Sequence, residues 1–261
     1  MQNRVVARRI TVALARPLVE AQPYDVAIAI DVLWATTTLA VLFERGCRGV
    51  WVASDADAAR AAGRAANRLI CGEEGGLPPP GFDHGNSPVE FARLDLSGRE
   101  VVFATTNGTG TLRACAAARR VFAGSFVNLT AAVRAAARAL DEPGDSSGRL
   151  LIACAGTHGR FGLEDAACAG MMVSVLVREN PDVALDDAAE AARRLYESYG
   201  GAFEAVRASR HARTLVELGL AEDVQFCAQV DVTHVVPELH PESRWPLHLV
   251  DDPAPEERLP G

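Results

Sequence analysis

Three apolar runs of this 261-residue chain each end in a loop of small polar residues and then enter a helical pattern. The segments read IAIDVLWATTT, VVFATTNGTGT and LIACAGTHGRFGLED, and they begin at Ile28, Val101 and Leu151. A buried strand, a loop rich in glycine or threonine and a following helix form the repeating unit of α/β proteins. We therefore predict an α/β fold in which strand–loop–helix units build a mostly parallel sheet with flanking helices.

The order of the other segments extends this prediction along the chain. Strands are expected at 9–15, 26–32, 49–53, 100–104, 120–123 and from Leu150, and helices at 39–45, 56–68, 129–140, 186–199, 202–209, 212–218 and from Leu163. We predict that Ser54 caps the helix at 56–68, that residues 69–92 form a long loop, and that residues 224–236 return one or two strands. Residues 1–261 are expected to form one α/β region, with subdomains near 1–140 and 141–240 left open and a proline-rich, acidic tail over the surface from Pro237.

The basic residues of the chain exclude several classes of enzyme. All 26 of them are arginine, and there is no lysine. A Schiff-base lysine, a pyridoxal phosphate enzyme and a Walker-type phosphate loop are excluded, since each requires lysine. The net charge of −8 and the lack of a basic run argue against nucleic acid as a partner.

The apolar residues and the cysteines indicate the expected compartment. No apolar run approaches the ~20 residues that span a bilayer, and the N-terminal residues lack the apolar core of a signal peptide. The six cysteines show no CxxC pair and lie in apolar segments, so we expect most of them to be buried, reduced thiols. These features predict a cytoplasmic protein without membrane contact, and the hydrophobic fraction of 49% makes a homodimer a reasonable expectation.

The polar loops that follow the strands carry the groups of a candidate site. In a parallel sheet such loops gather outside the carboxyl ends of the strands, where ligands bind. Threonine hydroxyls, an asparagine amide and glycine amides can donate to phosphate oxygens, and helix N-termini favour anions. Asp31, Glu164 and Asp165 are expected at the same edge and can hold a hard cation, which together predicts a metal-and-phosphate site. The simpler alternative for Glu164 and Asp165 is that they only complement a helix dipole.

The long predicted loop holds further residues of the types that position ligands. These are Asp83, His84, Asn86 and Ser87. Because long loops in compact domains are often functional, we favour a functional role. The alternative is that Asn86 and Ser87 cap a helix that begins near Pro88.

The six histidines show no HxH or HExxH pattern that would predict a zinc site. His84 and His158 lie in the candidate loops and can serve as general acids or as ordinary hydrogen-bonding residues. His211 lies on an expected helix, in SRHAR, which lacks the glycine of the Arg-His-Gly phosphatase motif. We therefore assign His211 no role.

Cys154 and Arg160 have the Cys-x5-Arg spacing of the cysteine-dependent phosphatases. In those enzymes a thiolate attacks phosphorus while loop amides and the arginine hold the oxygens. A pattern with two fixed positions is common by chance, and no histidine precedes Cys154. A structural thiol at the end of a strand is the alternative interpretation.

Six segments, in this order, resemble the 2-phosphosulfolactate phosphatase (ComB) family. They are IDVLWATTT from Ile30, GFDHGNSPVEF from Gly81, TTNGT from Thr105, GSFVN from Gly124, CAGTHGRFGLEDAACAG from Cys154 and SRHARTLVELGLAEDVQFCAQVD from Ser209. The resemblance covers residues 25–237. It implies a ComB-like α/β fold and a magnesium-dependent enzyme that hydrolyses 2-phosphosulfolactate, or a related small 2-phosphohydroxy acid, to the hydroxy acid and phosphate.

The resemblance also implies a set of site residues. Asp31, Glu164 and Asp165 are expected to contact Mg²⁺ and to take part in catalysis, with Asp83 as a further candidate for the catalytic base. The residues expected to bind substrate are Thr36, Thr37, Asn86, Ser87, Thr106, Asn107, Gly108, Thr109, Gly156 and Thr157. A small phosphorylated hydroxy acid is the expected partner.

Two positions depart from the family pattern. The family usually has arginine where this chain has Trp34, and arginine after Gly-Glu where this chain has Glu74. Arginine is the natural partner of sulfonate, carboxylate and phosphate groups, and Arg160 or Arg113 could compensate. The departures leave the exact substrate open, and they keep a non-catalytic phosphoanion-binding protein as an alternative.

Overall fold

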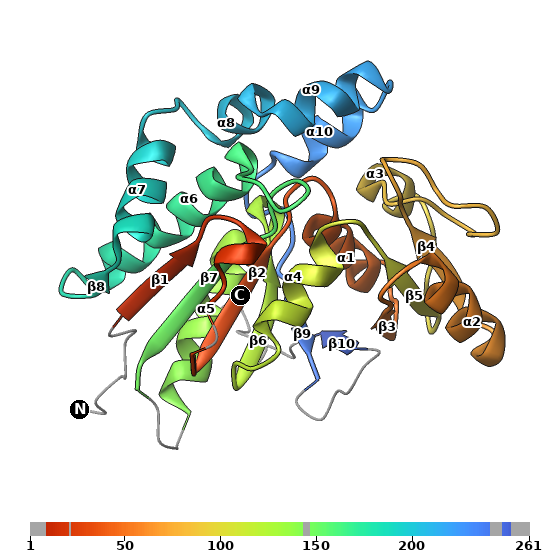
Figure 1. The fold of residues 1–261 in the computed structure, drawn as a ribbon, viewed down its shortest axis with the longest axis horizontal. Helices are drawn as coiled ribbons and strands as arrows, with labels where there is room; N and C mark the ends of the chain where they lie inside the picture. Colours follow the sequence, from red (N-terminus) through yellow and green to blue (C-terminus); the bar gives the residue numbers. More distant parts are fainter. Residues whose placement is uncertain (1–8, 21, 143–146, 241–246, 252–261) are drawn as a thin grey trace, which may run out of the picture.

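The computed structural model describes residues 9–20, 22–142, 147–240 and 247–251. These residues form one ten-stranded sheet in the order β4-β5-β3-β10-β9-β6-β2-β7-β1-β8 (Figure 1). The pairs among β1 to β8 are parallel, and only the pairs that involve β9 or β10 are antiparallel. The predicted α/β fold with a mostly parallel sheet is confirmed.

The strands are β1 Arg9–Ala13, β2 Val26–Ile30, β3 Gly49–Val52, β4 Leu69–Gly72, β5 Glu100–Ala104, β6 Arg120–Gly124, β7 Arg149–Cys154, β8 Ala184–Leu185, β9 Pro237–Leu239 and β10 Leu247–Asp251. The α-helices are α1 Ala35–Glu44, α2 Ala56–Ala66, α3 Pro88–Phe91, α4 Gly108–Cys115, α5 Leu129–Asp141, α6 Leu163–Glu179, α7 Asp187–Glu197, α8 Ala202–Ala208, α9 Arg210–Glu217 and α10 Ala221–Cys227. Two short 3₁₀ turns, η1 Arg16–Leu18 and η2 Phe126–Asn128, complete the order.

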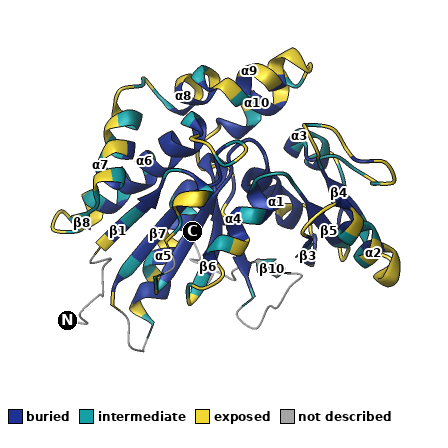
Figure 2. Cartoon of the chain, viewed as in Figure 1, coloured by how far each residue is buried: buried dark blue, intermediate teal, exposed yellow. Residues whose placement is uncertain are grey.

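The central strand β2 explains why helices cover both faces of the sheet. All five of its residues are buried. Val26, Ile28 and Ile30 point into a core shared with α5 and α6, while Ala27 and Ala29 point into a second core shared with α1 and α4. A strand that is apolar on both faces requires a layer of helices on each of them. Figure 2 shows that the strands are buried between the helices and that many of the exposed residues lie on the outer helices α2, α7 and α9.

The C-terminal segment differs most from the sequence-based prediction. Residues from Pro237 were expected to lie over the surface, but β9 and β10 lie inside the sheet between β6 and β3. The strands expected within residues 224–236 are absent, and α10 covers the first part of that range. The sequence pattern did not predict these strands, because they are short and their pairing partners are distant in sequence.

Two smaller predictions, on α2 and on the segment 69–92, are corrected by the structure. Asp55, and not Ser54, caps α2, because its side chain accepts a hydrogen bond from the Ala58 amide at 2.8 Å. The long loop expected at 69–92 begins with the edge strand β4 and ends in the short helix α3.

Helices α8, α9 and α10 follow α7 and lie over the carboxyl ends of β1, β2 and β7 (Figure 1). They place residues 202–227 above the loops that the sequence identified as the candidate site. None of the helices described is both long and apolar enough to cross a bilayer.

Candidate active site

Asp31 is the first residue after β2 and lies at the centre of the carboxyl edge, with 6% of its surface exposed. Its backbone is held by Thr36, whose hydroxyl accepts from the Asp31 amide at 2.9 Å. A Cβ atom on Gly108, at the start of α4, would lie 2.8 Å from Asp31 Oδ2 and 2.3 Å from the Ala35 side chain. Glycine at position 108 therefore lets the first turn of α4 approach the carboxylate.

Other carboxylates surround Asp31 and change its acidity. Burial, followed by the charges of Glu73 and Glu164, raises the pKa of Asp31 to about 7 against the lowering effect of the Ala35 and Trp34 amides. Glu73 is the residue that follows β4, and Glu164 lies in the first turn of α6. Side chains from three separate elements thus bring negative charge to one place.

Glu164 has a histidine as its partner. It is 2% exposed, and its Oε1 atom lies 3.4 Å from Nδ1 of His211 on α9. Burial lowers the pKa of His211, but the hydrogen bond and charge of Glu164, with the charges of Asp165 and Glu73, raise it above the usual value. The sequence analysis gave His211 no role, and the structure places it beside the predicted catalytic carboxylates.

Asp165 joins two of the predicted loops. Its Oδ1 accepts from the Val32 amide and its Oδ2 from the Gly156 amide, both at 2.9 Å. Burial, and then the charges of Glu164 and Asp31, raise its pKa well above the ordinary value. Asp165 therefore holds the segments after β2 and β7 together beside the other carboxylates.

Glu73 was missed by the sequence analysis because the glycine- and proline-rich segment around it shows no strand pattern. Its Oε1 accepts from the Thr106 amide at 2.8 Å, and its Oε2 accepts from the Thr106 hydroxyl at 3.2 Å and from the Gly76 amide at 2.9 Å. This carboxylate is therefore fixed in position, and it ties the segment after β4 to the segment after β5.

The structure brings the loops at 105–109 and 156–162 together, as the sequence predicted. Asn107 Oδ1 accepts from the His158 amide at 3.0 Å, and the Thr109 hydroxyl donates to the Thr105 carbonyl at 2.8 Å. Gly156 has φ +63°, and a Cβ atom there would lie 1.9 Å from the Arg160 carbonyl oxygen. The amides of Thr157 and Arg160 each donate to the other's carbonyl, which closes the turn.

Thr36 and Thr37 lie at the same edge, in the first turn of α1. The Thr36 hydroxyl donates to the carbonyls of Asp31 and Gly124, at 2.9 and 2.8 Å, and the Thr37 hydroxyl donates to the Val32 carbonyl at 2.9 Å. These donors shape the loop after β2. Substrate contact by the two threonines stays a prediction.

Asn86 and Ser87 have different environments. Ser87 caps α3 by accepting from the Glu90 amide at 3.1 Å, and its hydroxyl donates to Asp223 Oδ1 at 2.7 Å. Asn86 is 4% exposed, and its Oδ1 has no hydrogen-bond partner among the described residues. The capping alternative therefore accounts for Ser87, while Asn86 keeps an unused buried acceptor.

Trp34, at one of the two departures from the family pattern, is buried at the N-terminus of α1. Burial raises the pKa of Asp223, and hydrogen bonding by Ser87, the Val89 amide and the Trp34 indole opposes this rise only in part. Trp34 Nε1 and Asp223 Oδ2 nevertheless lack a partner at hydrogen-bond geometry within the described part of the chain. Where the family usually has an arginine, this chain thus has a tryptophan whose ring packs in the hydrophobic core.

Asp83 and His84 lie along β4 and not after its carboxyl end. Asp83 Oδ2 accepts from the Ile70 amide at 2.8 Å, near the amino end of that strand. His84 Nδ1 lies 2.7 Å from Glu90 Oε1. These contacts give both residues a structural role, and a catalytic role for Asp83 stays a prediction.

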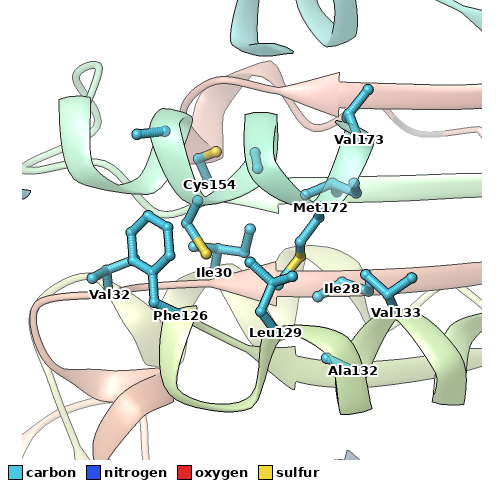
Figure 3. Close-up of a cluster of buried hydrophobic side chains, with 14 of the residues drawn as sticks. Ile28, Ile30, Val32, Phe126, Leu129, Ala132, Val133, Cys154, Met172 and Val173 are labelled. Atoms are coloured by element: carbon cyan, nitrogen blue, oxygen red, sulfur yellow. The ribbon is translucent and has the colours of Figure 1, made fainter. Parts of the chain in front are cut away.

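Cys154 lies in the hydrophobic core, among Ile30, Val32 and Phe126 (Figure 3). It has no exposed surface, and burial raises the pKa of its thiol well above the ordinary value, with a further contribution from the Asp165 charge. A buried, protonated thiol is a poor nucleophile. The geometry therefore supports the structural interpretation of Cys154, and all six cysteines are buried free thiols, as expected.

The carboxylates at this edge can contribute to a site for Mg²⁺. Within the described ranges, no three His, Cys, Asp or Glu side chains are arranged to hold a metal ion by themselves. Mg²⁺, however, is commonly bound by one or two carboxylates together with substrate phosphate and water. Asp31 and Glu164 offer hard oxygen donors, and neither has an arginine partner in the described part of the chain. The donor chemistry fits an open magnesium site and not a closed protein cage.

Comparison with known sequences decides the family. A sequence model described as 2-phosphosulpholactate phosphatase matches residues 14–242. The chain belongs to the 2-phosphosulpholactate phosphatase family. This membership confirms the resemblance and identifies the chain as a phosphoric monoester hydrolase.

Members of the 2-phosphosulpholactate phosphatase family from several bacteria are similar to the chain over most of its length. A probable 2-phosphosulfolactate phosphatase of Deinococcus radiodurans is 41% identical over 219 residues, which cover 83% of this chain and 88% of that protein. Proteins with the same description from Thermotoga petrophila and Thermus thermophilus are 39% and 38% identical, and each match covers 82% of this chain and 88% of the relative.

Proposed function

We propose that this protein is a Mg²⁺-dependent phosphatase that hydrolyses 2-phosphosulfolactate, or a related small 2-phosphohydroxy acid, to the hydroxy acid and phosphate. The convergence of Asp31, Glu73 and Glu164 at the carboxyl edge of the sheet carries this proposal. A metal ion would supply the positive charge that the cluster lacks and would also bind the negative phosphate group of the substrate. The names of the relatives support the choice of substrate class.

The proposed metal contacts are Asp31 and Glu164, with Asp165 as the predicted third. Bound there, Mg²⁺ would polarise the phosphoryl oxygens and neutralise the charge that develops on them. Asp165 keeps its positioning role in this arrangement, because both of its oxygens already accept backbone amides.

The first turn of α4 would orient the phosphate. The segment Thr106-Asn107-Gly108-Thr109 opens this helix, and the amides of Asn107 and Gly108, together with the helix dipole, favour an anion. The Thr106 and Thr109 amides already donate to Glu73 and Thr105. Arg16 supplies a cation at the side of the same turn, since its Nη1 would lie 2.1 Å from a Cβ atom on Gly110. Arg16 is half-buried, and its guanidinium has no hydrogen bond or ion pair to any described residue.

His211 would hold the proton that the leaving oxygen needs. Its pKa is raised, so a larger fraction is protonated near neutral pH than for an ordinary histidine. Glu164 orients the imidazole through Nδ1, which leaves Nε2 as the second nitrogen for proton transfer.

The test is release of inorganic phosphate from phosphosulfolactate, 2-phospholactate, 2-phosphoglycolate and 2-phosphoglycerate, each with Mg²⁺ and with EDTA. Turnover that needs the metal, and that Asp31→Asn reduces at least a hundredfold, would support the proposal. Asp182→Asn, a change of an exposed aspartate, is the matched control. Binding of these compounds without any turnover would instead establish a non-catalytic phosphoanion-binding protein, the second candidate.

A further inference from the structure

A cavity of about 210 Å³ lies beside the carboxylate cluster, at the carboxyl ends of β4 and β5. Its walls include Asp55, Glu73, Glu74, Phe82, Thr105 and Thr106. One water molecule needs only ~15 Å³ of such space. The cavity therefore has room for a chain of several atoms.

Two residues of this cavity adjoin the candidate active site, where the charge of one of them, Glu73, acts on Asp31. Glu73 and Thr106 line the cavity, and they are hydrogen-bonded to each other. Thr106 leads directly into Gly108, whose missing Cβ allows Asp31 Oδ2 to lie against the start of α4. A molecule whose phosphate lies at that helix start can therefore extend into the cavity.

The charges of the lining are all negative. Asp55 is used as the cap of α2, and Glu73 is fixed by Thr106 and Gly76. Glu74 is exposed, and its carboxylate has no hydrogen bond or ion pair to any described residue. The lining contains no arginine.

Arg60, whose guanidinium carbon lies 5.8 Å from the ring centroid of the lining residue Phe82, is engaged by other partners. Arg60 donates to the Pro80 carbonyl at 3.0 Å and pairs with Asp57 at 2.5 Å. An anionic group in the cavity would thus meet three carboxylates with no cation to balance it, whereas a hydroxyl or ammonium group would find acceptors.

We propose that this cavity holds the non-reacting arm of the substrate, and that this arm carries hydrogen-bond donors, hydroxyl or ammonium, in place of a sulfonate or a second carboxylate. The inference rests on the proposed function and narrows its substrate class. Glu74 is the specificity-determining residue, because its carboxylate is the one that remains free to accept from the arm.

The test compares arms of different charge on one phosphorylated three-carbon acid. The substrates are 2-phosphoglycerate with a hydroxyl arm, O-phosphoisoserine with an ammonium arm and phosphosulfolactate with a sulfonate arm. We expect kcat/KM for the hydroxyl and ammonium compounds to exceed that for the sulfonate at least tenfold. Glu74→Arg is expected to shift the ratio at least tenfold towards the sulfonate, and Glu74→Gln is expected to give an intermediate shift.

Glu44→Arg is the matched control, since it makes the same substitution at an exposed side chain at the C-terminal end of α1, which makes no ion pair with a described residue and lies outside the cavity. It is expected to change the ratio less than twofold. A wild-type preference for the sulfonate, or a ratio that Glu74→Arg and Glu44→Arg change equally, would overturn the inference.

Calorimetric binding of the products glycerate, isoserine and sulfolactate gives the same ratios without turnover. An enzyme that releases no phosphate from any compound, but whose product affinities follow the predicted order and respond to Glu74→Arg, would refute the proposed hydrolysis and retain the cavity assignment. Product affinities that favour sulfolactate would refute the cavity assignment whether or not hydrolysis occurs.

Discussion

His211 Nδ1 lies 3.4 Å from Glu164 Oε1, although the two residues belong to different helices. Glu164 is in the first turn of α6, and α9 brings His211 down onto it from above the sheet. Through this contact the Glu164 carboxylate and the His211 imidazole form an acid–base pair beside Asp31.

His211→Asn is expected to lower kcat by about 10²–10⁴-fold, because the leaving oxygen loses its proton donor. In the wild type, kcat should fall as the pH rises through the raised pKa of His211. The variant should lose that dependence, as pH–rate profiles would show. His234→Asn changes an exposed histidine and should leave the profile unaltered. A variant that is slower but keeps the alkaline decline would assign the proton to another group.

Metal-free protein is expected to lose stability as the pH rises from 5 to 8. Folded Asp31 has a pKa of about 7, compared with ~4 in an unfolded chain. The folded state therefore binds more protons between these values, and its free energy of unfolding falls by about 2.6 kcal/mol as the pH rises from 5 to 8. The raised pKa of His211 acts in the same direction. Urea unfolding in EDTA measures the effect, and Asp31→Asn should largely remove it, whereas Asp182→Asn should not.

Mg²⁺ is expected to stabilise the wild-type protein at pH 8 by binding only the folded state. The gain is ~2.7 kcal/mol at a Mg²⁺ concentration of 100 times Kd. Asp31→Asn and Glu164→Gln should abolish the rise in melting temperature, because each removes a negative oxygen from the proposed site. An equal rise in these variants would place the ion elsewhere.

Gly156→Ala is expected to reduce activity more than tenfold, because a Cβ atom would collide with the Arg160 carbonyl and displace the turn that Asp165 holds. Gly98 is a matched control, since it has φ +70° and a Cβ atom there would meet nothing within 4 Å. Gly98→Ala should cost only the ~1–2 kcal/mol of left-handed backbone strain and keep the activity. Both kcat and the melting temperature should be measured for the two variants. Backbone strain lowers the melting temperature of both, whereas the collision lowers kcat only in Gly156→Ala.

Cys154→Ala is expected to keep phosphatase activity within a few-fold, at a cost of about 1–2 kcal/mol in stability for a small core cavity. Thiol alkylation of the folded protein should have no effect on turnover, since the sulfur has no exposed surface. Loss of activity in a variant that still melts cooperatively would restore the covalent mechanism.

Much of the site could be predicted from local sequence because its residues belong to strand–loop–helix units. Asp31 follows a run that is apolar on both faces, so its place at the strand end was predictable from pattern alone. The meeting of the segments at Asn107 and His158 followed from the parallel order of the strands. Glu73 escaped prediction because the strand before it has four residues and lies between glycine-rich segments.

The sequence by itself determined the α/β fold, the family and the edge of the sheet at which polar loops gather, since short-range periodicity and turn residues encode these features. Only the tertiary structure decided which side chains meet there. His211 reaches Glu164 because α8 packs on α6 and leads into α9, and β9 and β10 enter the sheet through partners far away in sequence. Cys154 loses its reactivity because α5 and α6 bury the face of β7 on which it lies. Such juxtapositions depend on long-range packing, which no local pattern records.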